Sequence, residues 1–338
     1  MILLTGGTGL LGSHLLYELV RGRAEVVALK RPSSDLEELR RVFGYYTDEV
    51  EELFRRIDWM DADLLNQAEV ERALIDVEQV YHCAGMISFQ PRDRQQMIRF
   101  NVESTANVVN ACLSAGVNKL LHVSSTSAIG RPPEDSPARE SMIWAHSKTS
   151  TGYAESKFQS EMEVWRGIEE GLKAVIVNPS IILGAGFWER GSSSMFSRVA
   201  GGLKYAAPGV TGYVGVQDVV SAMTQLMNSD ISGERFIISE GDYSYQQMFE
   251  MIGQSLGVQR ELKQVSAPLM RNLVRMDVLA GFFTGKRRIT SEHVRAAFSK
   301  VRFSTEKIIQ ATGMKFAPLE QVIEQVAGHY REDHTGLR

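Results

Sequence analysis

The sequence is poor in cysteine and has no excess of basic side chains. Its two cysteines, Cys83 and Cys112, are too few for a disulfide framework or a cysteine-based metal cluster, and they fit a reducing, cytoplasmic environment. Lysine and arginine number 37 against 41 aspartates and glutamates, which gives a formal net charge of -4. A phosphate-binding surface usually needs a basic excess, so we expect no nucleic-acid partner.

Long apolar runs are also missing. The first twenty residues, MILLTGGTGLLGSHLLYELV, have no basic region and are interrupted by glycines, so we do not interpret them as a signal peptide. The most apolar later stretch, Ala267–Phe283, contains Arg271, Arg275 and Asp277. A bilayer-spanning helix needs about 20 mostly apolar residues. We therefore expect no integral membrane segment, and we predict an amphipathic helix over a pocket at this stretch.

The histidines are scattered along the chain and show no metal-ligand spacing. We therefore expect no metal site. His82 and His122 lie at the ends of predicted strands, beside a predicted cofactor turn, and we interpret them as structural. His146 is equally isolated.

What the sequence does contain is an alternation of strand-length apolar segments with segments of helical period, over about residues 1–130. This alternation is typical of a parallel sheet covered on both faces, and it predicts an α/β Rossmann fold with a doubly wound parallel sheet. We assign residues 1–180 to this NAD(P)-binding domain. For residues 181–338 we expect a smaller, mainly helical substrate-binding part, from which VGVQDVVSAMTQLM and GERFIIS return to the sheet.

Three glycines, Gly6, Gly9 and Gly12, stand between a predicted strand and a predicted helix. The first permits a tight turn, the second lets a pyrophosphate approach the backbone, and the third lets helix and strand pack closely. The unpaired N–H groups of the helix N-terminus would then face the phosphates. The motif predicts a dinucleotide site.

The end of the second predicted strand, VVALKRPSS, indicates which dinucleotide is bound. An acidic residue at this point pairs with the ribose hydroxyls of NAD, whereas an arginine accommodates the 2′-phosphate of NADP. Here Lys30 and Arg31 occupy the place, and the next acidic residue is Asp35. Arginine can bind a phosphate through two N–H groups at once, so we favour NADP over NAD.

Tyr153 and Lys157 stand one helical turn apart in YAESK, and therefore on the same face of a helix. A free tyrosine has a pKa near 10 and is a poor acid or base at neutral pH. A neighbouring ammonium stabilises the phenolate and brings the pKa toward the working range. We predict that Tyr153 is a general acid–base supported by Lys157.

With these motifs together, the chain resembles the extended short-chain dehydrogenase/reductases, the NAD-dependent epimerase/dehydratase family. It is most similar to the branch of dihydroflavonol reductases and 3β-hydroxysteroid dehydrogenases, and the resemblance covers nearly the whole chain. The segments that carry it are TGGTGLLG, YHCAG, FNVESTANVV, HVSSTSAIG, YAESK, VGVQDVV and KVRFSTEKIIQATGMKFAPLEQVI.

The resemblance implies further roles. Ser125, with Ser124 as the alternate, would hold the substrate oxygen, and Asn101 would open a helix and orient the lysine through water. Asp63 would contact the adenine amine, although it could equally be a helix N-cap. The loop Asn178–Ser180 would contact the nicotinamide amide. The complete predicted cofactor site comprises Gly6, Thr8, Gly9, Leu10, Leu11, Gly12, Lys30, Arg31, Asp63, Leu64, Ala84, Gly85, Tyr153, Lys157, Pro179 and Ser180.

Three functions agree with these residues. We favour an NADP-dependent oxidoreductase that transfers hydride between the nicotinamide and a carbonyl or alcohol substrate. A nucleotide-sugar epimerase or dehydratase with tightly bound NAD is the first alternative. Two features weaken it: Thr126-Ser127 replaces the Asp-Glu pair of the dehydratases, and Ile181 stands near the place of an epimerase asparagine. The second alternative is a non-catalytic cofactor-binding sensor or scaffold, which would usually have lost Tyr153 or Lys157.

The substrate is a small molecule that the sequence does not identify. Its predicted pocket segments are residues 86–97, 186–196 and 267–283, in which Phe89, Trp188 and the methionines suit a partly apolar molecule. Arg92, Arg94 and Arg190 would suit an acid or a phosphate. The resemblance also implies a homodimer, formed through the helices that start at Asn101 and Tyr153.

Overall fold

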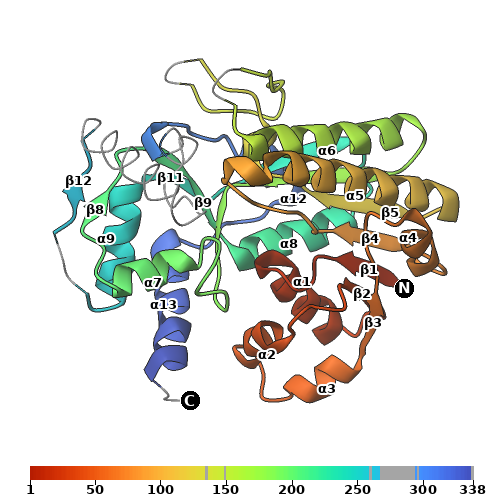
Figure 1. Cartoon of the computed structure of the whole chain (residues 1–338), viewed down its shortest axis with the longest axis horizontal. Coiled ribbons are helices and arrows are strands. Elements are labelled where there is room, and N and C mark those ends of the chain that lie inside the picture. Colours follow the sequence, from red (N-terminus) through yellow and green to blue (C-terminus); the bar gives the residue numbers. More distant parts are fainter. Residues whose placement is uncertain (134–135, 148–149, 259–260, 267–293, 295–296, 336–338) are drawn as a thin grey trace.

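A seven-stranded parallel sheet forms the centre of the computed structural model (Figure 1), with the strand order β10-β6-β5-β4-β1-β2-β3. Every neighbouring pair in this sheet is parallel. The structure describes residues 1–133, 136–147, 150–258, 261–266, 294 and 297–335. The predicted doubly wound α/β fold is therefore confirmed.

The elements of the chain have the following bounds. The strands are β1 (Ile2–Thr5), β2 (Val26–Lys30), β3 (Ile57–Asp61), β4 (Gln79–His82), β5 (Lys119–Val123), β6 (Ala174–Pro179), β7 (Ile181–Leu183), β8 (Tyr205–Ala206), β9 (Val210–Gly215), β10 (Glu234–Ile238), β11 (Gly241–Ser244) and β12 (Lys263–Gln264). The helices are α1 (Leu10–Arg21), α2 (Glu37–Gly44), α3 (Val50–Arg55), α4 (Gln67–Ala73), α5 (Arg94–Ala115), α6 (Gly152–Glu169), α7 (Ser194–Ala200), α8 (Val216–Met227), α9 (Tyr245–Ser255), α12 (Glu306–Thr312) and α13 (Leu319–Thr335), with short 3-10 turns η1 (Pro91–Asp93) and η2 (Thr126–Ala128).

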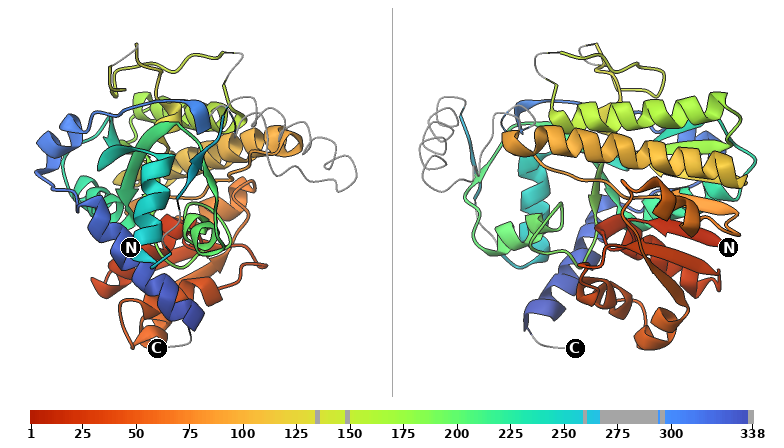
Figure 2. Two further views of the ribbon diagram at one scale, coloured as in Figure 1. Left: turned by 90° about the vertical axis from the view of Figure 1, so that its left-hand side faces the viewer. Right: turned by 45° about the vertical axis from the view of Figure 1, so that its right-hand side comes forward.

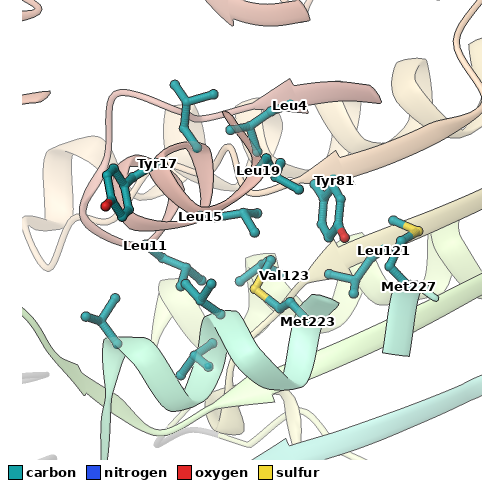
Figure 3. Close-up of a cluster of buried hydrophobic side chains, with 14 of the residues drawn as sticks. Leu4, Leu11, Leu15, Tyr17, Leu19, Tyr81, Leu121, Val123, Met223 and Met227 are labelled. Atoms are coloured by element: carbon teal, nitrogen blue, oxygen red, sulfur yellow. The ribbon is translucent and has the colours of Figure 1, made fainter. Parts of the chain in front are cut away.

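Helices cover both faces of the sheet because successive strand residues point to opposite sides. Leu3 of β1 packs with α4, α5 and α6, whereas its neighbour Leu4 packs with α1 and α8. The second of these layers is drawn in Figure 3, where Tyr81 and Leu121 of the sheet approach Leu15 of α1. The apolar strands are thus buried on both faces, as a parallel sheet requires.

The chain leaves the main sheet after β6. A single residue, Ser180, separates β6 from β7, and β7 joins a three-stranded sheet of order β11-β9-β7. With the two-stranded sheet β12-β8 and helices α7, α9 and α13, it forms a second part beside the first (Figures 1 and 2). The predicted smaller, mainly helical part is present, and it also contains these two small sheets.

Two later segments return to the main sheet in different ways. GERFIIS forms β10, which pairs with β6 at the edge of the sheet, as predicted. VGVQDVVSAMTQLM forms the end of β9 and helix α8, which covers the sheet and adds no strand to it. The predicted amphipathic helix at Ala267–Phe283 lies outside the described residues. No helix within the described residues is both long enough and apolar enough to cross a membrane.

Candidate active site

The glycine motif forms the turn from β1 into α1, and its three glycines differ in their surroundings. Gly6 has a φ of +73°, a conformation that side-chain-bearing residues rarely adopt. A Cβ atom on Gly6 would lie 2.5 Å from the backbone nitrogen of Ala84, and one on Gly12 would lie 2.1 Å from the carbonyl oxygen of Gly6. From a Cβ atom on Gly9, the nearest atom would be the carbonyl oxygen of Gly6, at 3.5 Å. Gly6 and Gly12 are therefore required by packing, whereas a Cβ on Gly9 would make only an ordinary van der Waals contact.

Gly9 is also the N-cap of α1, and no side chain of the described residues caps this helix end. The first turn of α1 contains no acidic residue. Unpaired N–H groups at a helix N-terminus attract anions. The absence of a close contact at Gly9 and the uncapped helix end among the described residues together fit a pyrophosphate, so the site passes this test for a dinucleotide.

The other predicted cofactor residues follow neighbouring parallel strands and therefore meet at one edge of the sheet. The hydroxyl of Thr5 accepts a hydrogen bond from the backbone nitrogen of Ala84, at 3.2 Å, which joins the turn after β1 to the turn after β4. Asp63 follows β3, and its carboxylate accepts from the backbone nitrogen of Leu65. The N-cap of α4 is Asn66, so the alternative role of Asp63 as a helix N-cap is wrong.

Lys30 and Arg31 lie at the end of β2, but their surroundings differ. Lys30 is paired in register with Asp61 of β3, and its Nζ lies 2.5 Å from the carboxylate of Asp61. Arg31 is exposed, and a turn closed by Ser34 holds its backbone. Because Asp61 already neutralises Lys30, Arg31 is the better placed of the two for a 2′-phosphate.

The predicted catalytic residues come together on α5, α6 and the segment after β5. Lys157 is 5% exposed, and its Nζ donates to the carbonyl oxygen of Val123 at 2.9 Å. Tyr153 lies one turn earlier on the same helix, and the side chain of Ser125 is near enough to lower its pKa. Ser124, the alternate, is buried beside Glu161 instead. The structure therefore brings Ser125, and not Ser124, to the tyrosine.

Asn101 lies beside this group, although it does not open its helix. Helix α5 begins at Arg94, after a turn that starts at Pro91, because residues 94–100 continue the helical pattern. The Asn101 side chain accepts from the backbone nitrogen of Met86 at 2.7 Å and donates to the Met86 carbonyl and the Ser156 hydroxyl, each at 3.0 Å. It thus joins the loop after β4 to α6.

Burial perturbs the titration of both helix residues. It lowers the pKa of Lys157 to about 8, although Cys83 and Glu161 act in the opposite direction. Burial also raises the pKa of Tyr153, an effect that the side chain of Ser125 opposes. A lysine that titrates near neutrality beside a buried tyrosine is the kind of perturbed pair found at functional sites.

The last part of β6 and the residue after it contain two buried polar atoms without a hydrogen-bond partner among the described residues. They are Asn178 Oδ1 and Ser180 Oγ, and both residues are less than a tenth exposed. Buried polar groups are almost always hydrogen-bonded, so an unpartnered pair indicates a missing ligand or water. A carboxamide could satisfy such atoms, which fits the predicted nicotinamide contact.

Some of the residues that we predicted to line a substrate pocket have other surroundings in the structure. Trp188 is 3% exposed and packs in the core of the second part, so it lines no open pocket. Arg94 and Arg190 form ion pairs with Glu155 and Glu38, respectively. Phe89 does lie next to the predicted catalytic tyrosine, as a residue that contacts the substrate should: its ring centroid is 6.2 Å from that of Tyr153.

Sequence reasoning missed a buried ion pair next to this group. Glu161 of α6 pairs with Arg235 of β10 at 2.8 Å. The signal in the sequence was the position of Glu161, one helical turn beyond Lys157 on the same face. Arg235 stands directly before the apolar residues of the strand ERFII, which was a second signal.

The fold and this residue group define an NAD(P)-dependent oxidoreductase of the extended short-chain dehydrogenase/reductase type. The model of the NAD dependent epimerase/dehydratase family matches residues 2–239, and the chain belongs to that family, which confirms the resemblance described above.

Two relatives and one solved structure illustrate the likeness. Sterol demethylase protein B of Methylococcus capsulatus is 28% identical over 280 residues, which cover 80% of this chain and 79% of that protein. Tetraketide alpha-pyrone reductase 2 of Arabidopsis thaliana is 27% identical, covering 74% of this chain and 81% of its own. The crystal structure of UDP-glucose 4-epimerase from Thermotoga maritima with UDP-glucose superimposes with a TM-score of 0.78 at 20% identity, covering 98% of this chain and 99% of that one. At that identity the last likeness shows the fold alone.

The contrast between Gly9 and Gly12 gives a paired prediction. Gly9→Ala should leave stability nearly unchanged but weaken dinucleotide binding, because the added methyl enters the space that the phosphates would fill. Gly12→Ala should lower the free energy of unfolding by about 3 kcal/mol, because its Cβ meets backbone that cannot move aside. Denaturant unfolding and a fluorescence titration with NADPH measure the two effects. Equal loss of stability in both variants would contradict the assignment of Gly9 to a ligand.

Proposed function

We propose that the protein is an NADPH-dependent reductase of a small carbonyl compound, or the reverse dehydrogenase. The observation that carries this proposal is that the buried ammonium of Lys157, which donates to the carbonyl oxygen of Val123 at 2.9 Å, lies one helical turn from Tyr153, on whose pKa the side chain of Ser125 acts. When bound, NADPH would supply the hydride. The glycine turn, Arg31, Ala84, Gly85 and Ser180 would hold it.

The protein's own side chains would donate the proton and stabilise the anion that remains. Ser125 and Tyr153 present two hydroxyl groups that can hold a carbonyl oxygen between them. Tyr153 would donate its proton to that oxygen as the alcohol forms. The Lys157 ammonium would stabilise the phenolate that remains, at a point from which burial excludes most water. Asn101 would keep the loop after β4 in place beside α6.

The preference for NADP rests on Arg31. It is exposed, it follows β2, and it forms no ion pair among the described residues. Its guanidinium could bind a 2′-phosphate through two N–H groups. The nearest carboxylate at this strand end, Asp61, pairs with Lys30 instead of standing where a ribose would be bound.

The epimerase alternative needs cations for a nucleotide diphosphate. All three arginines of the predicted pocket segments, Arg92, Arg94 and Arg190, form ion pairs with carboxylates. The substitution of Thr126-Ser127 for an acidic pair stands against a dehydratase. The sensor alternative is weakened by the assembled contact between Tyr153 and Ser125, which cofactor binding alone does not require.

Removing the tyrosine hydroxyl tests catalysis directly. In Tyr153→Phe, reduction of aromatic and aliphatic ketones should fall by about 100- to 10,000-fold, because the proton donor is lost. NADPH affinity should change little. Activity should also be highest below about pH 8 and decline above it, as Lys157 loses its proton and ceases to stabilise the phenolate. Initial rates across pH 6–10 measure this, and full activity in Tyr153→Phe would eliminate the proposed mechanism.

The cofactor proposal is tested by Arg31→Ala. Affinity for NADPH should fall about tenfold to a hundredfold, the worth of charge-assisted hydrogen bonds to a phosphate, while affinity for NADH should stay the same. Arg55→Ala, which removes an exposed arginine of α3 in the same domain, is the matched control. If NADH binds better than NADPH to the unaltered protein, the preference is wrong and the epimerase alternative becomes the stronger one.

We also propose a homodimer that assembles on α5 and α6, and a cytoplasmic location, which the two free cysteines suit. These two helices lie side by side at one face of the molecule (Figure 2), and Met162 on α6 is 41% exposed. Sedimentation at micromolar concentration should show a dimer, and Met162→Glu should dissociate it. A monomer for the unaltered protein would refute this arrangement.

A further inference from the structure

The ion pair between Glu161 and Arg235 is buried inside the first part of the molecule. Glu161 has no exposed surface, and the side chain of Arg235 is 10% exposed. Removing two charges from water costs roughly what their attraction returns, so such a pair is a weak source of stability. The hydrogen bonds that the pair makes with its neighbours indicate a role other than stabilising the fold.

The first contact leads to the serine segment. The side-chain nitrogen of Asn178 donates to Glu161 Oε1 at 2.5 Å and to the carbonyl oxygen of Ser125 at 3.0 Å. The hydroxyl of Ser124 lies beside the same carboxylate. The backbone that places Ser125 against Tyr153 is therefore tied to Glu161.

The second contact leads to the chain that follows η2. The Arg235 guanidinium donates to the carbonyl oxygen of Glu140 at 2.6 and 2.9 Å and to that of Met142 at 2.9 Å. The Met142 carbonyl also accepts from the backbone nitrogen of Gly130, at the end of the serine segment. This one ion pair thus connects α6, β10, the serine segment and the chain around Glu140 and Met142.

Glu161 also supplies the charge next to Lys157. The other titratable groups around this lysine are neutral at neutral pH: burial raises the pKa of the Cys83 thiol to about 12, lowers the pKa of His82 to about 3, and lowers that of His122 well below its usual range. Tyr153 is held in its protonated form by burial as well. Among the described groups that act on the lysine, Glu161 is the one that can carry a negative charge.

We propose that Glu161 is a positioning residue of this active site, which fixes the Ser125 segment through Asn178 and supplies the negative charge that keeps Lys157 cationic. Burial raises the pKa of the Glu161 carboxyl, and Arg235 opposes that rise. Arg235 also anchors the segment around Glu140. This inference rests on the roles proposed above for Ser125 and Lys157.

The experiment compares Glu161→Gln with Glu163→Gln. Both changes remove one carboxylate from α6, but Glu163 pairs with Arg166 at the surface and is the matched control. The pKa of Lys157 is followed by carbon NMR of protein labelled at lysine Cε, with Lys157→Arg to assign its signal. Ketone reduction with NADPH is measured in parallel, as kcat and as KM for NADPH.

In Glu161→Gln we expect the pKa of Lys157 to fall by about one unit and kcat to fall about tenfold, with KM for NADPH unchanged. The control should change neither quantity. A folded Glu161→Gln with an unaltered Lys157 titration and normal kcat would overturn the proposal.

Because Glu161→Gln leaves Arg235 without a counter-charge, the variant could lose stability. The double variant Glu161→Gln/Arg235→Gln removes both charges and should show the same lowered pKa and kcat. A return of both to the original values would mean that the pair only stabilises the fold, and would overturn the proposal. If even the unaltered protein reduces no ketone, the proposed function fails, while the Lys157 titration still decides the charge role of Glu161.

Discussion

The backbone contact between Gly6 and Gly12 is the constraint on which the predicted cofactor site depends. Helix α1 can leave β1 at this angle only because no side chain separates the carbonyl oxygen of Gly6 from the helix. The same turn touches Ala84 after β4, since β1 and β4 are neighbours in the sheet. Two turns far apart in the sequence thereby enclose the uncapped N-terminus of α1 from both sides, and an anion can approach backbone N–H groups there.

The electrostatics around Lys157 and Tyr153, the predicted catalytic pair, follow from their burial. A lysine removed from water would readily lose its proton, and burial does move the pKa of Lys157 down to about 8. The neighbouring titratable groups add no charge of their own at neutral pH, because burial keeps His82, His122 and the Cys83 thiol neutral. A single carboxylate on the same helix can then offset the cost of burying the ammonium. Acid–base chemistry near neutral pH needs such a balance.

The two parts of the molecule differ in what they place next to Tyr153. The family match covers residues 2–239, which contain the turn, the tyrosine and the lysine. The second part contributes Trp188 and Phe196 to its own core instead of to an open pocket. Phe89 reaches Tyr153 from the loop after β4, where hydrogen bonds from Ser88 to Asp93 and to Met97 hold the backbone. The apolar contact next to Tyr153 therefore comes from the first part of the molecule.

The sequence by itself determined the alternation of strands and helices, the glycine turn and the pair Tyr153–Lys157. These features depend on residues within a few positions of one another, so periodicity and spacing reveal them. Only the tertiary structure decided that Asp61 pairs with Lys30 and that Glu161 meets Arg235 from 74 positions away. The physical reason is that a charged side chain selects its partner by proximity in the folded chain, and no local pattern records which distant strand will supply it.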